Sequence, residues 1–201
     1  MKKYYARLIA IVALGMFVSV AHAKDPKAPK VSNATPTWDT QINGPERFVV
    51  LAEFDDKAVL DTETGLVWEQ LAGDTNNDGV VDVTDKKNWN SARFVCTGKN
   101  VGRRQGWRLP AFYELTSLVD LDPLAAPGPE APLPAGHPFS GVVFSNVVEF
   151  YWSATSFAGL VDSHAWATTF TTTEGFTPGQ FKGLTGYVWC VRGGSPGPSV
   201  F

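Results

Sequence analysis

Four short blocks, each containing a tryptophan, recur along this chain of 201 residues. They are Thr64–Trp68, Gly106–Pro110, Tyr151–Thr155 and Trp189–Arg192. Segments rich in turn-forming or polar residues separate the blocks, and helical periodicity is scarce. Because aromatic side chains bury large apolar surfaces, we expect the tryptophan of each block to lie in one core. The pattern predicts a loop-rich α+β domain.

The first 23 residues have the pattern of an export signal. The segment begins with three basic residues, Lys2, Lys3 and Arg7. They are followed by the apolar run Leu8–Val20 and by the small-residue ending Ala21–Ala23. The apolar run is too short for a stable membrane span, and no other stretch approaches the roughly 18 apolar residues that a span requires. We therefore predict a signal peptide at 1–23 and a bacterial mature chain without a membrane span, located in the periplasm or outside the cell.

Acidic residues outnumber basic ones, and the net charge of −3 becomes more negative once the signal is removed. A chain without a basic stripe is poorly suited to neutralising phosphates, so nucleic acid is not an expected partner. A small basic cluster is formed by Lys99, Arg103, Arg104 and Arg108. It is either a solvated loop whose last arginine belongs to the fold or a site for an anionic glycan.

The chain contains two cysteines, Cys96 and Cys190. In an exported protein, which passes into an oxidising compartment, an even number of cysteines predicts a disulfide. The alternative is a pair of free catalytic thiols.

Alternation and turn residues predict several strands. We expect them within Phe48–Phe54, Ala58–Leu60, Leu66–Glu69, Tyr151–Ala154, Ala165–Phe170 and Tyr187–Val191. Asp61–Gly65 has turn chemistry, so the strands on either side of it should form a hairpin. The expected sheet is mainly antiparallel.

Two helices are expected. In the first, Lys86–Thr97, the residues Trp89, Ala92 and Cys96 fall on one face. The second is expected at 110–120, because it begins with a proline, a residue suited to a first turn.

Three other segments have no regular period. Lys24–Arg47 is a polar leader, Asp122–Phe139 is a long loop rich in proline, and 195–201 is a short tail. The domain itself is therefore expected to span 48–194.

The strongest chemical signal is the twelve-residue segment Asp74–Asp85. It has oxygen-bearing side chains at positions 1, 3, 5, 9 and 12 and glycine at position 6, as an EF-hand-like calcium loop requires. The expected donors are the side chains of Asp74, Asn76, Asp78, Asp82 and Asp85 and the backbone carbonyl of Val80. With one copy, the predicted Ca²⁺ site is structural. The alternative is a metal-free turn rich in Asn and Asp.

The four blocks and their order resemble the Lcl C-terminal domain family over roughly Val59–Gly194. The resemblance implies a C-type-lectin-like fold, with two helices, a mainly antiparallel twisted sheet and long loops, in a secreted or surface-displayed binding protein. In that fold a disulfide commonly joins the first helix to the last strand, which suits Cys96 and Cys190. The calcium loop resembles the dockerin variety, which also ends in aspartate.

The resemblance implies a secreted, non-enzymatic binding protein, an adhesin or lectin-like protein that recognises a surface or glycan ligand. A structural or assembly component of the bacterial envelope, acting through contacts with other envelope proteins, is the alternative. A third hypothesis is an enzyme like the formylglycine-generating oxidases, which share the broad fold but need a reactive cysteine pair. The predicted disulfide would use that pair.

No Glu-Pro-Asn or Gln-Pro-Asp triplet, the signature of calcium-dependent sugar sites in C-type lectins, occurs in the sequence. A sugar could instead be recognised by stacking on aromatic side chains, for which the candidates are Trp152, Trp166 and Tyr187. Such residues more often belong to the core.

Overall fold

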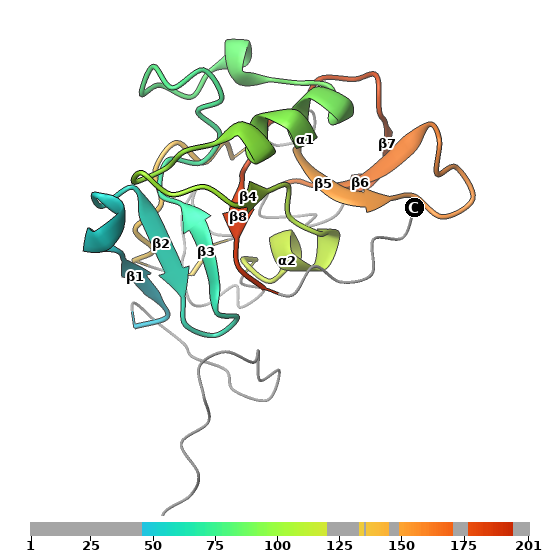
Figure 1. Ribbon diagram of the computed structural model, residues 1–201. Helices are drawn as coiled ribbons and strands as arrows, with labels where there is room; N and C mark the ends of the chain where they lie inside the picture. The colour runs from blue at the N-terminus through green and yellow to red at the C-terminus, as the bar shows by residue number, and fades with distance from the viewer. Residues whose placement is uncertain (1–45, 120–132, 135, 145–148, 171–176, 195–201) are drawn as a thin grey trace, which may run out of the picture. The chain divides into compact units, whose positions relative to one another are not determined.

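The computed structural model describes residues 46–119, 133–134, 136–144, 149–170 and 177–194, in which strands form two antiparallel sheets and accompany two α-helices (Figure 1). These residues belong to one compact unit. The predicted signal peptide, nearly all of the leader, most of the proline-rich loop and the tail lie outside the described residues. Among the residues described, no helix has the length and apolarity needed to cross a membrane.

The first sheet has five strands. They are β1 (Phe48–Val50), β2 (Ala58–Asp61), β3 (Leu66–Glu69), β4 (Trp107–Arg108) and β8 (Val191–Arg192). Their order is β1-β2-β3-β8-β4 and every pair is antiparallel. The carboxylate of Asp61 accepts hydrogen bonds from the Glu63 amide and the Thr64 hydroxyl, which stabilises the turn between β2 and β3. The predicted hairpin is confirmed.

The second sheet has three strands in sequence order. They are β5 (Tyr151–Ser156), β6 (His164–Thr168) and β7 (Thr177–Phe181). The sequence predicted one sheet, whereas the described strands fall into two. The contact between Tyr151 and Tyr187 is an isolated parallel bridge, and the last strand starts only at Val191. Strand β7 was missed because it contains proline and glycine, which are rare in strands.

Helix α1 spans Trp89–Gly98 and follows Asn88, whose side-chain oxygen accepts a hydrogen bond from the Ser91 amide at 2.9 Å. Its buried face contains Trp89, Ala92 and Cys96, as predicted. Such a cap satisfies one of the amides that a helix start leaves without a partner.

Helix α2, Phe112–Thr116, is shorter than the predicted helix at 110–120. The Glu114 carboxylate accepts from the Ala111 amide at 2.8 Å and pairs with Arg108. Beyond the helix, the Leu118 amide bonds to the Leu115 carbonyl, a tighter turn than the α-helix has. The apolar periodicity therefore continues past the last α-helical turn.

The tryptophans of all four blocks are buried, each at most 2 % exposed. They belong to two packed clusters. Trp68 and Trp189 pack edge to face, with ring centroids 5.5 Å apart, in one cluster. Trp107 and Trp152 lie in the other, beside the two cysteines. The expectation that the blocks form the core is confirmed, although the core has two parts.

The predicted disulfide is present between Cys96 and Cys190, whose Cα atoms are 5.4 Å apart. It joins the buried face of α1 to the residue that precedes β8. Within the described part of the chain no cysteine is free. The bridge therefore connects a helix with the start of β8, which lies between β3 and β4 in the first sheet.

Replacing both cysteines by alanine should lower the free energy of unfolding by about 4 kcal/mol, because a bridge that spans 94 residues restricts the unfolded chain strongly. Urea unfolding of the wild type, the variant and the reduced wild type measures the effect. The intact mass of the wild type should also lie below the reduced mass by two hydrogen atoms. Equal unfolding midpoints for all three proteins would contradict the expected contribution.

Candidate functional site

The segment Asp74–Asp85 connects β3 with α1 and ends in a short 3₁₀ helix, Val83–Asp85. Two of its residues have positive φ, Asn77 at 62° and Gly79 at 85°. A Cβ atom at Gly79 would meet nothing within 4 Å, so glycine is needed there for its backbone conformation and not for space. These two residues bend the loop back on itself.

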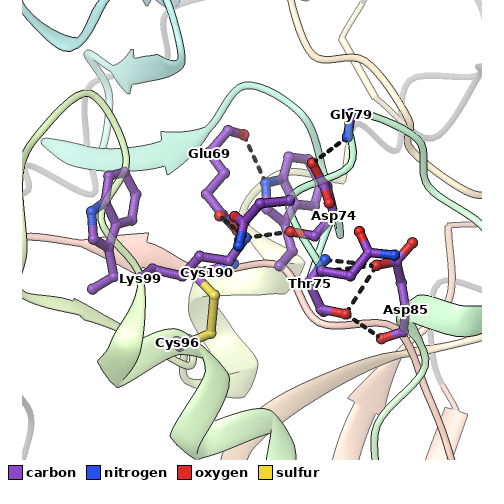
Figure 2. Close-up of polar contacts among 12 residues, drawn as sticks. Glu69, Asp74, Thr75, Gly79, Asp85, Cys96, Lys99 and Cys190 are labelled. Carbon is purple, nitrogen blue, oxygen red and sulfur yellow. Dashed lines mark hydrogen bonds and ion pairs between the residues drawn. A yellow bond between two sulfur atoms is a disulfide. The ribbon is translucent and has the colours of Figure 1, made fainter.

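The side chains at the first three predicted ligand positions lie close together. The Asp74 carboxylate accepts hydrogen bonds from the amides of Asp78 at 3.2 Å and Gly79 at 3.0 Å (Figure 2). The Asn76 side chain accepts from the Asp78 amide and donates to the Asp78 carboxylate, both at 2.9 Å. The chain path thus brings Asp74, Asn76 and Asp78 together.

Asp85, at position 12, is completely buried. Its carboxylate accepts from the Thr75 amide at 2.8 Å, the Thr75 hydroxyl at 2.9 Å, the Asn76 amide at 3.3 Å and the Asp82 amide at 2.9 Å (Figure 2). Burial by itself would raise the pKa of Asp85, but these hydrogen bonds outweigh it and hold the pKa below its usual value. Asp85 therefore closes the loop by binding its beginning to its end.

The loop suits a calcium ion in its residue types and in its path, but its side chains are engaged with its own backbone. Among the described residues, no group of three acidic, histidine or cysteine side chains is arranged to hold a metal. A carboxylate has about four lone-pair sites. Asp74 and Asp78 retain sites for a cation. At Asp85, three donors converge on Oδ1 and one donor binds Oδ2, so only Oδ2 retains an acceptor site.

The remaining two predicted ligands are Val80 and Asp82. Val80 is exposed at the outer end of the loop. Asp82 caps the 3₁₀ helix, because one of its oxygens accepts from the amide and the hydroxyl of Thr84, both at 2.7 Å. Its other oxygen takes part in none of these bonds.

A buried ion pair holds the start of the loop. The Lys99 ammonium lies 3.0 Å from the Glu69 carboxylate, and the two side chains are 7 % and 5 % exposed. Lys99 also donates to the Asp74 carbonyl (Figure 2). It donates as well to the side-chain oxygen of Asn77. The second oxygen of Glu69 accepts from the Cys190 amide at 2.9 Å. One lysine therefore ties the loop to the first sheet.

The pKa of Glu69 is raised, because burial disfavours the charged carboxylate, although the Lys99 ammonium and the Cys190 amide lower it in part. Sequence reasoning missed this pair. A glutamate at the end of an apolar strand is a signal, but only the fold brings Lys99, thirty residues later in the chain, to it.

The loop, the ion pair and the end of α1 surround a cleft of about 810 Å³. That volume falls in the range of small-molecule sites, about 300 to 1,000 Å³. Its lining includes Asp74, Thr75 and Asn77 from the loop, together with Phe94 and Asn100. Glu69 and Lys99 also line it. The loop that the sequence predicts to bind calcium therefore lines this cleft.

The nominal sugar platforms are mostly core residues. Trp152 is completely buried and Tyr187 is 4 % exposed. Trp166 is half-buried between Phe112 and Phe157, whose ring centroids lie 5.0 and 4.9 Å from its own. The structure thus favours the core interpretation for these aromatic residues.

The basic cluster does not form a common surface. Arg103 pairs with Asp55 at 2.8 Å, Arg108 pairs with Glu114, and Lys99 is buried with Glu69. The structure therefore favours the hypothesis of a solvated loop whose last arginine belongs to the fold over that of an anionic-glycan site.

The sequence model of the Lcl C-terminal domain family matches residues 57–192, more than half of the chain. The match covers the loop, the ion pair and both cysteines. No curated protein matches the chain.

Replacing Lys99 by methionine should destabilise the protein by about 3 to 5 kcal/mol near neutral pH, because Glu69 would remain buried without its cation. The loss of stability should be smaller near pH 4.5, which is the ordinary pKa of a glutamate side chain. The pKa of the Glu69 carboxyl is higher in the folded protein than in the unfolded chain. The stability linked to its protonation is therefore present below the unfolded pKa and is lost as the pH rises through the folded pKa. Lys99→Met raises that folded pKa further, so more stability is lost at high pH.

Urea unfolding at acidic and neutral pH measures this difference. The matched control is Lys99→Met combined with Glu69→Gln, which removes the titrating group and should remove the additional pH dependence. If Lys99→Met costs the same at both pH values, Glu69 does not carry the buried charge.

Proposed function

The chain belongs to the Lcl C-terminal domain family, and on that premise we propose that it is an exported, non-enzymatic binding protein, adhesin-like or lectin-like, that recognises a surface or glycan ligand. The observation that carries this proposal is the cleft of about 810 Å³ between the Asp74–Asp85 loop and α1. It joins charged and amide side chains to an exposed aromatic ring, as specific ligand sites do.

The proposal includes a C-type-lectin-like fold. Two features support it: the mixture of short helices with antiparallel sheets, and the disulfide that joins the first helix to the residue before the last strand. The disulfide also supports export, because such bonds persist in oxidising compartments such as the periplasm or the cell exterior. Both cysteines are used in it, which argues against an oxidase that needs a reactive thiol pair.

The proposal also includes one structural Ca²⁺ ion in the loop. Its ligands would be the side chains of Asp74, Asn76, Asp78, Asp82 and Asp85 and the carbonyl of Val80. Four aspartates within twelve residues repel one another until a cation neutralises them, and calcium takes six to eight oxygen ligands. Asp85 would join them through Oδ2, which accepts one hydrogen bond, whereas Oδ1 accepts three. The ion would then order the wall of the cleft.

The binding function is tested with the exported full chain on an array of neutral, sialylated and sulfated oligosaccharides and, in parallel, by affinity capture from an envelope extract. Saturable binding to an oligosaccharide supports a glycan ligand. Capture of one envelope protein at constant stoichiometry, with no binding on the array, would instead support a structural or assembly component of the envelope. If neither assay shows specific binding, the proposed function is wrong.

Calcium at about one hundred times its dissociation constant should raise the melting temperature by about 5 to 10 °C over the protein with chelator, because the ion binds only the folded loop. Asp78→Ala should abolish this difference. The control Asp162→Ala removes an exposed carboxylate outside the loop and should keep it. Thermal unfolding of the three proteins measures the shift, and a wild type that is insensitive to chelator would refute the calcium site.

A further inference from the structure

Phe94 is the most exposed of the large apolar residues described, with 78 % of its surface accessible. It lies on α1, whose opposite face buries Trp89, Ala92 and Cys96. Burying an exposed aromatic ring against a ligand releases water from a large apolar surface. Phe94 is therefore positioned for contact with another molecule and adds little to the core.

Phe94 lines two hollows, not one. The first is the cleft of about 810 Å³ beside the Asp74–Asp85 loop, and the second, of about 410 Å³, lies between α1 and the turn regions next to β6 and β7. Because Phe94 lines both, the two hollows lie next to each other along α1. We call the surface formed by the two hollows and Phe94 the α1 groove. Its form suits an extended ligand with several units.

The second hollow repeats the chemistry of the first. It contains another exposed ring, Phe181, which is 53 % exposed. Around that ring lie side chains that donate and accept hydrogen bonds, Asn88, Asn90, Ser91 and Ser163. In the first hollow the corresponding groups are Thr75, Asn77 and Asn100. Each hollow therefore combines an exposed aromatic ring with amides and hydroxyls.

Charge in the α1 groove is nearly balanced. Its lysines are Lys57, Lys99 and Lys182, and its acidic residues are Glu69, Asp74, Asp78 and Asp162. Lys99 is neutralised by Glu69. Lys182 donates to the Val161 carbonyl and lies over the Trp89 ring, with Nζ 3.8 Å from its centroid. Such a lining favours neither a polyanion nor a polycation.

We propose that the α1 groove binds a linear, uncharged oligosaccharide, with one sugar ring stacked on Phe94 and the chain continuing into both hollows. A sugar presents an apolar face of C–H groups, which fits an aromatic ring. Its hydroxyls donate and accept hydrogen bonds at once, so they match amides, hydroxyls and charged groups of either sign. This inference rests on the proposed binding function and specifies its ligand and its site.

The test starts with the full exported chain on the oligosaccharide array, followed by isothermal titration with the neutral oligosaccharide that binds best. Phe94→Ala should weaken binding by at least about tenfold, as the loss of a central aromatic anchor does. Phe94→Tyr keeps the ring and should bind within about threefold of the wild type. Because Phe94 is exposed, both variants should keep the wild-type melting temperature.

Tyr113→Ala is the matched control, because Tyr113 is an aromatic residue, 50 % exposed, on α2 outside both hollows. It should bind like the wild type. A neutral oligosaccharide that binds equally to wild type, Phe94→Ala and Tyr113→Ala would overturn the α1 groove and leave the binding function intact. Binding to sulfated glycans alone, or to an envelope protein and no glycan, would overturn the ligand class.

Discussion

The buried ion pair between Glu69 and Lys99 is the interaction on which the rest of the candidate site depends. Two charged groups that leave water at a cost of several kcal/mol each must be fully satisfied by partners. Each oxygen of Glu69 has such a partner, the Lys99 ammonium for one and the Cys190 amide for the other. Lys99 in turn donates to the carbonyl of Asp74, the first residue of the Asp74–Asp85 loop. The pair thus connects three segments that are far apart in sequence.

The disulfide and the ion pair both act at the end of α1, from Cys96 within the helix and from Lys99 directly after it. Cys96 is bonded to Cys190, and three residues later Lys99 reaches the carboxylate that also binds the Cys190 amide. The end of α1 is therefore fixed to the first sheet by a covalent and an ionic link. Those links hold one wall of the cleft in place, while the Asp74–Asp85 loop supplies the other. In this arrangement the tryptophan-centred blocks provide the buried framework.

Local pattern predicted the elements whose residues determine them by themselves. The hairpin of β2 and β3 follows from the turn at Asp61–Gly65, and α1 follows from the spacing of Trp89, Ala92 and Cys96. Strand β7 could not be predicted, because its pairing with β6 overrides the weak propensity of its proline and glycine. The division into two sheets also could not be predicted, since strand pairing is decided by long-range contacts.

The sequence by itself determined the composition of the site: two cysteines able to form one bridge, four tryptophans able to form a core, and a twelve-residue loop with oxygen ligands at calcium spacing. Only the tertiary structure decided how those groups are used. It gave the Asp85 carboxylate four donors from its own loop, gave Lys99 its partner in β3, and left Phe94 exposed between two hollows. The physical reason is that spacing along the chain fixes which groups are neighbours in a loop or on a helix face, whereas burial, desolvation and ion pairing depend on segments that meet only when the chain folds.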